Sequence, residues 1–505
     1  MRDGRVIIIG AGIGGLAAAA RLAHASVPVT VLEQHAQPGG KMRTVPSDSG
    51  PVDAGPTVLT MRPVFEDLFE SLGETLSDHL SLQPLDILAR HYWADGTTLD
   101  LHADPAKSIA AVAATFGSKT AKAFTAFSAR AKRLFSAFDA PMMQHASPSQ
   151  LGLAQTVMRQ PQLIADMAPH RTLHTALRRQ LREPKLVQLF GRYATYVGGS
   201  PFQSPALLSL IWQAEAAGVW SVQGGMHQLA QALEHLAKAR GAVFHYNTPV
   251  ARIVKQGGRV SQVVTDRDTF QADQVLFNGD PRALSTGLLG PAAEAAVSEK
   301  AVTPRSLSAH VMAFDAIPKG PALAHHTVFF ADAENAEFSA LEKGEMPEDA
   351  TLYVCAQDAA GGVAGPQKQR FEIIRNAPPA LQQTQEDTDR CLTLIQDRFA
   401  TFGLNFTPAP GRSALTAPMD FDRMFPASQG SLYGRSPHGL TAALQRPTAT
   451  TPIKGLYLCG GGTHPGAGVP MATLSGKHAA AAILKDRALT STSHQTAMRG
   501  GMSTA

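Results

Sequence analysis

The sequence predicts an α/β protein with a sheet domain assembled from discontinuous segments, an α+β domain and a helical insert. Three observations lead to this prediction. The first 33 residues follow the order strand, glycine-rich turn, helix, strand, which is typical of a βαβ unit. Strand and helix patterns that suit the same domain return at residues 221–300 and 451–487. The stretch between residues 104 and 220 is helical instead.

Length, charge and cysteine content narrow the class of protein. A chain of 505 residues exceeds what one hydrophobic core usually serves, so we expect several sub-domains. The formal net charge of +4 is small and spread along the chain, which argues against a nucleic-acid partner. The cysteines, Cys355, Cys391 and Cys459, are far apart, so neither a disulfide framework nor a metal site is predicted.

Amino-acid composition and the positions of glycine and proline divide the chain into six expected segments. They are residues 1–103 (cofactor-binding, with part of the α+β domain from about 61), 104–220 (helical insert or substrate lid), 221–300 (cofactor-binding, continued), 301–450 (α+β substrate domain), 451–487 (cofactor-binding, C-terminal) and 488–505 (flexible tail).

Hydrophobic periodicity places the individual elements within these segments. Predicted strands cover residues 5–10, 27–33, 242–246, 250–254, 260–265, 272–278, 308–314, 327–330, 351–356 and 455–459. Predicted helices cover residues 14–25, 108–127, 129–138, a segment ending at Gly241, about 383–399, and 471–485. The glycine pair at residues 257–258 predicts a hairpin between two of these strands.

The opening turn, GAGIGG at residues 10–15, fits the GxGxxG pattern directly between a strand and a helix. Gly10 allows the tight turn, Gly12 lets the backbone approach a pyrophosphate, and Gly15 lets the helix pack close to the strand. Glu33, at the end of the second strand, can accept hydrogen bonds from ribose hydroxyls. Together these features predict a Rossmann-like dinucleotide site rather than a glycine-rich bend.

Three later segments favour FAD over a nicotinamide dinucleotide. The stretch GGKMR at residues 39–43 places a second glycine pair beside the cofactor, and the strand near Val250 is expected to contact adenine. The third segment, residues 455–472, runs from a strand through three glycines to a helix that begins near Pro470. The N–H groups near Met471 and Ala472 would then face the flavin edge that becomes negative on reduction.

Read together, these motifs resemble the phytoene desaturase family of FAD-dependent carotenoid oxidoreductases over nearly the whole chain. The motifs are GAGIGG (10–15), GGK (39–41), DAGPT (53–57), GVW (218–220), GGM (224–226) and THPGAGVP (463–470). Three further stretches resemble a narrower branch, the bacterial 1-hydroxycarotenoid 3,4-desaturases, or hydroxyneurosporene desaturases, of phototrophic purple bacteria. They are HYWADG (91–96), YVGGSP (196–201) and the stretch from FPA (425–427) through LYGR (432–435) to HG (438–439).

The resemblance implies an FAD-dependent desaturase that introduces a C=C bond, between C3 and C4, into an acyclic 1-hydroxycarotenoid such as 1-hydroxyneurosporene. Flavin N5 would accept a hydride while the neighbouring carbon loses a proton. The expected cofactor-binding residues are Gly10, Gly12, Gly14, Gly15, Glu33, Gly40, Lys41, Gly55, Pro56, Thr57, Val250, Asp280, Gly461, Gly462, Met471 and Ala472. His464 is the candidate catalytic residue, although holding its own turn explains it equally well.

The substrate requires an elongated apolar channel, because placement supplies much of the rate when polar catalytic groups are few. Trp212, Trp220, Phe329 and Phe330 are candidates for its lining, with core packing the better explanation. Arg435 and His438 lie in a polar loop that could meet a terminal hydroxyl, or they are solvated.

Several alternatives stay open at the level of sequence. Phytoene desaturases and carotenoid isomerases use a similar cofactor cradle, a prenyl-binding escort protein uses it without catalysis, and an NAD(P)-dependent dehydrogenase shares the opening turn. The expected partners are a long apolar carotenoid, a membrane surface, and oxygen or a quinone as electron acceptor. No run of apolar residues is long enough to span a bilayer. We therefore expect a cytoplasmic enzyme that is peripherally associated with the inner or photosynthetic membrane.

Overall fold

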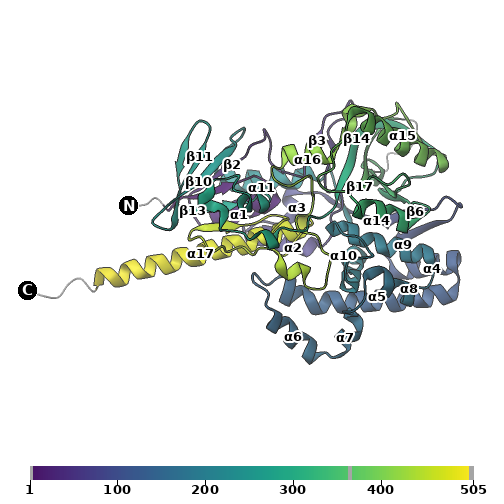
Figure 1. Ribbon diagram of the computed structural model, residues 1–505, viewed down its shortest axis with the longest axis horizontal. Helices are drawn as coiled ribbons and strands as arrows, with labels where there is room; N and C mark the ends of the chain where they lie inside the picture. Colours follow the sequence, from purple (N-terminus) through teal and green to yellow (C-terminus); the bar gives the residue numbers. More distant parts are fainter. Residues whose placement is uncertain (1–3, 362–366, 500–505) are drawn as a thin grey trace, which may run out of the picture.

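The computed structural model describes residues 4–361 and 367–499. Two sheets dominate it, and Figure 1 shows them side by side with a group of helices below. The predicted α/β class is confirmed, with a parallel sheet and a separate mixed sheet in one chain.

The parallel sheet has the strand order β20-β13-β1-β2-β9. Its strands are β1 (Val6–Ile9), β2 (Val29–Leu32), β9 (Val243–His245), β13 (Gln274–Phe277) and β20 (Leu456–Leu458). Every residue of β1, β2 and β13 is buried, as expected for parallel strands covered on both faces. Three distant stretches of sequence therefore build one sheet.

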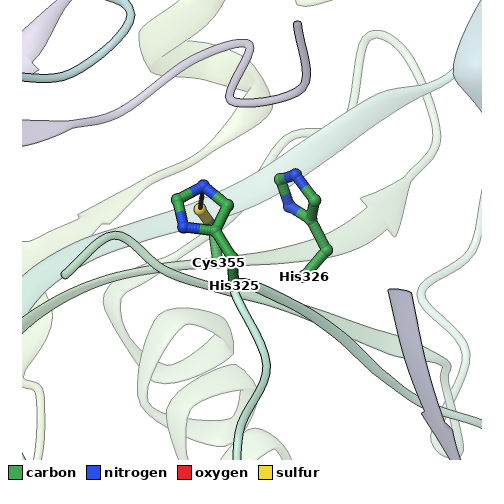
Figure 2. A group of neighbouring side chains, drawn as sticks. All are labelled: His325, His326 and Cys355. Carbon is green, nitrogen blue, oxygen red and sulfur yellow. Dashed lines mark hydrogen bonds between the residues drawn. The ribbon is translucent and has the colours of Figure 1, made fainter. Parts of the chain in front are cut away.

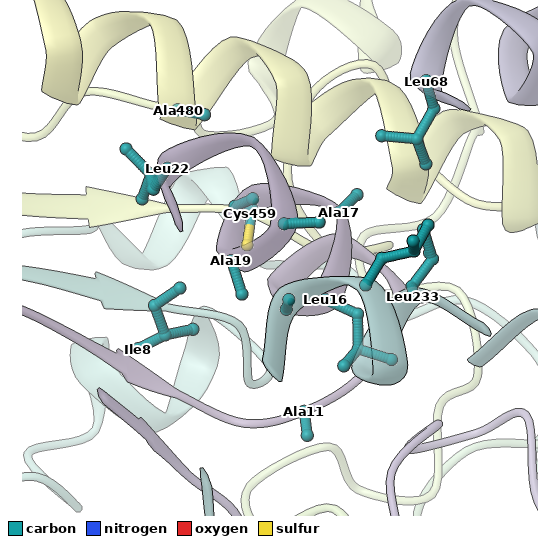
Figure 3. Close-up of a cluster of buried hydrophobic side chains, with 14 of the residues drawn as sticks. Ile8, Ala11, Leu16, Ala17, Ala19, Leu22, Leu68, Leu233, Cys459 and Ala480 are labelled. Carbon is teal, nitrogen blue, oxygen red and sulfur yellow. The ribbon is translucent and has the colours of Figure 1, made fainter. Parts of the chain in front are cut away.

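Small residues allow the helices to pack closely on this sheet. The sheet is accompanied by α1 (Ile13–His24), α11 (His227–Ala239) and α17 (Val469–Arg499). A Cβ atom on Gly476 of α17 would lie 2.3 Å from the carbonyl oxygen of Gly14, so only glycine fits where α17 crosses α1. Figure 3 shows the resulting core, to which α1 contributes Leu16 and Ala17, α11 contributes Leu233 and α17 contributes Ala480.

A three-stranded antiparallel sheet continues the chain beside the parallel sheet. It consists of β10 (Val250–Gln256), β11 (Arg259–Thr265) and β12 (Thr269–Gln271). The predicted hairpin between β10 and β11 is confirmed. Gly257 and Gly258 have φ values of 61° and 77°, which residues with a side chain rarely adopt, so the glycine pair forms the turn.

The mixed sheet has the order β18-β14-β17-β16-β15-β6-β7, and β19 pairs with β14. Its strands are β6 (Ile87–Tyr92), β7 (Thr98–His102), β14 (Ser308–Lys319), β15 (His326–Phe329), β16 (Leu352–Ala356), β17 (Gln369–Ala377), β18 (Asn405–Thr407) and β19 (Leu415–Thr416). The predicted strands at 308–314, 327–330 and 351–356 belong to it. Strand β17 was not predicted, because charged and amide side chains interrupt its apolar residues.

Helices cover the mixed sheet, and other helices make up the insert. On the sheet lie α14 (Glu334–Glu342) and α15 (Gln385–Thr401), the latter close to the helix predicted at 383–399. The insert contains α4 (Pro105–Phe116), α5 (Ser118–Phe138), η1 (Asp139–Met143), α6 (Gln150–Arg159), α7 (Gln162–Met167), α8 (Leu173–Gln180), α9 (Pro184–Gly191), η2 (Arg192–Val197), η3 (Ala206–Leu210) and α10 (Ile211–Ala216).

The shorter elements join these layers. The strands are β3 (Thr44–Val45), β4 (Val52–Asp53), β5 (Leu82–Pro84) and β8 (Trp220–Val222). The helices and helical turns are α2 (Arg62–Glu70), α3 (Leu76–His79), α12 (Arg282–Ser285), α13 (Pro291–Glu294), η4 (Glu299–Ala301), η5 (Ala359–Gly361), η6 (Arg412–Ala414), α16 (Pro418–Met424) and η7 (Ala442–Gln445).

The tail expected from residue 488 begins inside helix α17. This helix continues without a break to Arg499, and Figure 1 shows it extending away from the sheets. The reason is that neither glycine nor proline occurs between Lys477 and Arg499, so nothing in the sequence ends the helix there. Residues 500–505 of the predicted tail lie outside the described residues.

Within residues 4–361 and 367–499, no helix is long and apolar enough to cross a membrane.

One buried acid in the mixed sheet has no hydrogen-bond partner among the described residues. Glu372 of β17 is 0% exposed, neither carboxyl oxygen is bonded, and its cross-strand neighbours are Ala313 and Cys355. Burial, with a smaller contribution from Asp53, raises the pKa of Glu372 well above its ordinary value of 4.5. The folded protein therefore keeps a proton there that the unfolded chain releases.

Replacing this acid is expected to change how stability depends on pH. Between pH 4.5 and the raised pKa the folded state binds more protons, so the wild-type free energy of unfolding falls as pH rises through this range. Glu372→Gln should reduce this fall, whereas Glu348→Gln, whose side chain is 80% exposed, should leave it unchanged. Urea unfolding at several pH values from 5 to 9 measures the difference. Equal slopes for wild type and Glu372→Gln would contradict the assignment.

Candidate cofactor and substrate site

A cavity of about 510 Å³ adjoins the ends of the parallel strands and extends to the mixed sheet and the insert. All the predicted cofactor residues except Gly15 and Met471 line it: Gly10, Gly12, Gly14, Glu33, Gly40, Lys41, Gly55, Pro56, Thr57, Val250, Asp280, Gly461, Gly462 and Ala472. Residues from both ends of the sequence thus meet in one site. Its position at the carboxyl ends of parallel strands is the usual place for a nucleotide.

The opening turn has the geometry that its glycines predict. Gly10 has a φ of 98°, and a Cβ atom on Gly15 would lie 2.3 Å from the carbonyl oxygen of Gly10. Gly15 therefore shapes the turn from behind, without lining the cavity. Gly12 and Gly14 face the cavity at the start of α1, where unpaired N–H groups favour an anion.

The second glycine pair lies against this turn. The N–H of Gly39 donates to the carbonyl oxygen of Ala11 at 2.8 Å, and a Cβ on Gly40 would meet Cα of Gly12 at 3.2 Å. Gly55 is equally confined, because its Cβ would lie 1.9 Å from the carbonyl oxygen of Lys41. These approaches leave room for a cofactor that side chains would otherwise occupy.

Glu33 is buried at the end of β2 with its carboxylate at the edge of the cavity. One oxygen accepts the N–H of Ala11 at 2.6 Å and the other accepts the N–H of His35 at 2.9 Å. A carboxylate has further lone pairs, so Glu33 can hold the turn and still accept ribose hydroxyls.

The sequence analysis missed Asn278, which joins the glycine segments. Its side-chain amide donates to the carbonyl oxygen of Gly10 at 3.1 Å, and the thiol of Cys459 donates to its side-chain oxygen at 3.3 Å. Cβ atoms on Gly12, Gly14 or Gly460 would each come within 2.9 Å of this side chain. The available signal was an amide residue at the end of the predicted strand 272–278, directly before Gly279.

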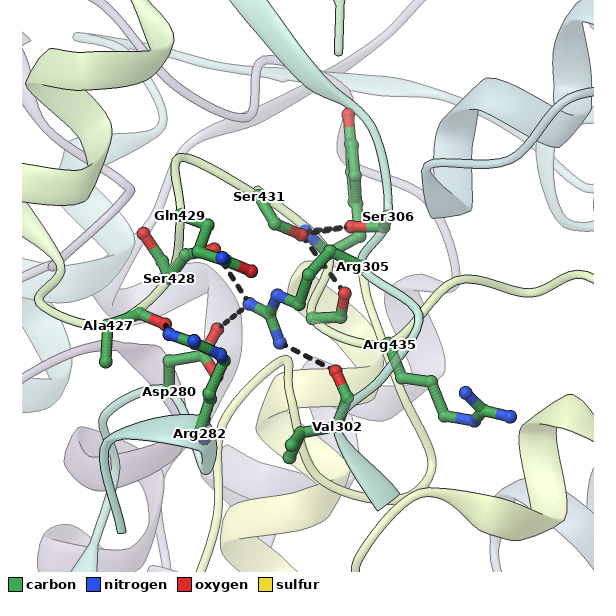
Figure 4. Close-up of polar contacts among 12 residues, drawn as sticks. Asp280, Arg282, Val302, Arg305, Ser306, Ala427, Ser428, Gln429, Ser431 and Arg435 are labelled. Atoms are coloured by element: carbon green, nitrogen blue, oxygen red, sulfur yellow. Dashed lines mark hydrogen bonds and ion pairs between the residues drawn. The ribbon is translucent and has the colours of Figure 1, made fainter. Parts of the chain in front are cut away.

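A charged group lies where the parallel sheet meets the substrate domain. Figure 4 shows Asp280 paired with Arg305, which also donates to the carbonyl oxygen of Ser428 at 3.0 Å. The paired side chains are each 5% exposed. Lys41 is nearby and donates to the carbonyl oxygen of Leu432 at 2.6 Å. Burial lowers the pKa of Lys41 to about 8, and Asp280 opposes this effect.

The C-terminal segment completes the cradle. Gly461 and Gly462 line the cavity, and α17 begins at Val469 with Pro470 and Ala472 also in the lining. The hydroxyl of Ser475 accepts the N–H of Gly460 at 2.7 Å, which ties the glycine loop to the helix. Met471 is not among the residues that line the cavity.

The position of His464 favours the structural alternative over catalysis. Its side chain is 2% exposed, its Nε2 lies 2.9 Å from the carbonyl oxygen of His145, and its ring stacks on His478. It does not belong to the described lining of the cavity. Burial lowers the pKa of His464 to about 4, so the ring is neutral near pH 7.

The polar loop that contains Arg435 and His438 was considered for binding a terminal hydroxyl group, but its side chains bond to neighbouring loops. Arg435 is 7% exposed and donates to the carbonyl oxygen of Thr303 and the side chain of Gln445. Nε2 of His438 accepts the N–H of Ser200 at 3.0 Å. Both expectations, hydroxyl binding and solvation, are therefore wrong for Arg435, whose side chain joins two buried loops.

The aromatic residues considered for the lining of the channel are packed in the hydrophobic core, which was the other explanation given for them. Trp212, Phe329 and Phe330 are 3%, 0% and 1% exposed, and they pack in two hydrophobic clusters. Trp220 packs against a third. The apolar part of the cavity is formed instead by Val58, Ile211, Ala214, Val311, Ile374 and Leu432.

One group of potential metal ligands occurs in the described part of the chain, where none was predicted. Figure 2 shows His325, His326 and Cys355, whose ligand atoms lie within 4.8 Å of one another. Nδ1 of His326 lies 2.7 Å from the hydroxyl of Tyr353, which in turn lies 2.8 Å from the hydroxyl of Thr57. These contacts connect the group to the cavity wall, since Tyr353 and Thr57 line it.

The residues present fit FAD. A glycine cradle that Cβ atoms would fill, an anion-binding helix start and a carboxylate for ribose line one cavity. The fold and site define a dinucleotide-dependent oxidoreductase. The model of the flavin-containing amine oxidoreductase family matches residues 13–484, so the chain belongs to that family, and FAD as cofactor is confirmed.

Curated relatives extend this result along the whole chain. Hydroxyneurosporene desaturase of Cereibacter sphaeroides is 53% identical over 485 residues, which cover 96% of this chain and 98% of the relative. Hydroxyneurosporene desaturase of Rhodobacter capsulatus is 47% identical, with 95% and 98% covered. The resemblance drawn from the motifs is thereby confirmed.

A solved structure agrees on the fold. Wild-type putrescine oxidase bound to putrescine has a TM-score of 0.60 and 15% sequence identity, covering 95% of this chain and 99% of that chain. At this identity the likeness concerns the fold alone.

Gly55→Ala is expected to disrupt the cofactor cradle. The new methyl would overlap the carbonyl oxygen of Lys41, and overpacking of this kind costs about 1–3 kcal/mol or more. The variant should lose thermal stability and most of its flavin, measured as the ratio of flavin to protein absorbance. Gly411→Ala is the control, because its Cβ meets nothing within 4 Å. Normal flavin content in Gly55→Ala would contradict the close approach of Gly55 to Lys41.

Proposed function

We propose that this protein is an FAD-dependent carotenoid desaturase that introduces the C3–C4 double bond into an acyclic 1-hydroxycarotenoid such as 1-hydroxyneurosporene. The observation that carries the proposal is a single cavity that joins the dinucleotide cradle to an apolar compartment. The printed names of the relatives support the substrate class.

The apolar compartment is suited to positioning a polyene. When bound, FAD supplies the two-electron oxidation that the reaction requires. The side chains of Ile211, Val311 and Ile374 exclude water and hold a polyene that has few polar groups for the protein to bind. A conjugated chain spreads developing positive charge over its own carbons, so a dedicated triad of side chains is not needed.

Incubation with 1-hydroxyneurosporene in detergent or lipid tests the proposal. The expected product has two hydrogen atoms fewer and absorbs at longer wavelength, because conjugation is extended. Parallel reactions with air and with a quinone identify the electron acceptor. A product of unchanged mass would indicate an isomerase, and bound but unchanged polyene would indicate an escort protein. Either result would overturn the assignment.

We further propose that the enzyme works on the cytoplasmic side of the inner or photosynthetic membrane, attached to its surface through α6 and α7. Leu151 and Met158 are each 69% exposed and lie seven residues apart on α6, and Ile164 of α7 is 55% exposed. Exposed apolar side chains on neighbouring helices suit the interface of a bilayer. Figure 1 shows both helices at the lower edge of the molecule, away from the sheets.

Charged side chains on this face should abolish attachment. The double substitution Leu151→Asp with Met158→Asp is expected to reduce co-flotation with anionic vesicles at least several-fold while flavin content stays normal. Val243→Asp is the matched control, since Val243 is also half exposed, at 50%, but lies on β9 at the edge of the parallel sheet. Equal flotation of the double variant and wild type would exclude this surface.

A further inference from the structure

The lining of the cavity includes a group of polar side chains that lies outside the dinucleotide cradle. Arg192 and Tyr196 of η2 and Glu215 of α10 line it together with the apolar residues of the substrate compartment. They belong to the helical insert, whereas the dinucleotide cradle is built from the parallel sheet and its loops. The group therefore lies in the substrate part of the cavity.

Hydrogen bonds order this group. The hydroxyl of Tyr196 donates to one oxygen of Glu215 at 2.9 Å, and the hydroxyl of Tyr193 donates to the other at 2.7 Å. Arg192 donates to the hydroxyl of Tyr196 at 3.1 Å and its guanidinium stacks over the Tyr196 ring. Glu215 is 3% exposed and Arg192 is 9% exposed. The positions of both charged groups are thus held by their neighbours.

The network is not complete by itself. Nε of Arg192 is buried and has no hydrogen-bond partner among the described residues. A buried N–H without a partner is costly, particularly on a charged group. A ligand that accepts a hydrogen bond here would remove this cost.

Arg192 lines the cavity and also borders a separate void of about 10 Å³, which has room for a single water molecule at most. The ring of Tyr193 packs against Phe190 and Trp212. The void on this side of Arg192 is therefore too small to hold a polyene chain.

We infer that Arg192, Tyr196 and Glu215 bind the hydroxyl group at the end of the polyene, and so determine which end of the substrate is oxidised. An alcohol can donate to the carboxylate and accept from the guanidinium at the same time. Because Arg192 and Glu215 have opposite charges, a charged ligand end would be attracted by one of them and repelled by the other, whereas a neutral hydroxyl can bond to both. A purely hydrocarbon end would leave the buried N–H without a partner.

This inference rests on the proposed desaturase function and adds a reason for its regiochemistry. A hydroxyl held by these residues fixes the distance from the hydroxylated end of the substrate to the oxidised carbon pair. The apolar side chains along the compartment contact any polyene in much the same way, so they cannot set this register alone. The three polar residues are accordingly specificity determinants and not proton-transfer groups.

Tyr196→Phe tests the inference with two matched polyenes, 1-hydroxyneurosporene and neurosporene. Wild type should favour the hydroxylated substrate in kcat/KM. The variant should lower this preference about tenfold, because its kcat/KM should fall for the hydroxylated substrate only. Binding of both polyenes, followed by quenching of tryptophan fluorescence, should show the same selective loss. Glu215→Gln serves as a second variant should Tyr196→Phe fail to bind FAD.

Tyr193→Phe is the control. It also removes a hydrogen bond from a tyrosine hydroxyl to Glu215, but Tyr193 is not among the residues that line the cavity. It should change the preference less than twofold. Equal losses on both substrates in Tyr196→Phe, or an equal effect of Tyr193→Phe, would overturn the inference. A wild type that desaturates both polyenes equally would also overturn it and leave the desaturase function standing. A wild type that desaturates neither polyene would instead refute the proposed function.

Discussion

The close approach of two glycine segments around Asn278 is the constraint on which the site depends. The opening turn and Gly460 lie against this one amide side chain, and the carbonyl oxygen of Ala472 at the start of α17 lies against Gly14. Their backbones can meet only where Cβ atoms are missing. This convergence brings the two ends of the chain together and leaves the elongated space that FAD requires.

A second constraint concerns charges buried at the junction of the two large sheets. The pair formed by Asp280 and Arg305 joins the loop after β13 to the entry of the substrate domain. Each partner would be costly to bury alone, so removal of either would leave an uncompensated charge. The pair therefore specifies how the substrate domain is placed on the cofactor domain, and with it the course of the cavity between them.

The parts of the site that the sequence predicts are those formed by residues close together in the chain. The GxGxxG turn, the acid at the end of β2 and the β10–β11 hairpin each depend on local backbone conformation, and each was found where expected. Strand β17 and the full length of α17 were missed. In β17 the buried Glu372 and Arg375 break the apolar pattern, because their environment comes from neighbouring strands and helices.

The sequence by itself determined the α/β class, the dinucleotide turn and the family resemblance, since glycine spacing and strand periodicity record backbone requirements directly. Only the tertiary structure decided which side chains face the substrate. Arg192 and Glu215 are ordinary residues of two short helices in the chain, and packing of the insert against the mixed sheet brings them into the lining of the cavity. Packing likewise turns Arg435 and His464 away from it. Side-chain direction at a buried interface depends on contacts between distant segments, and no local pattern encodes those contacts.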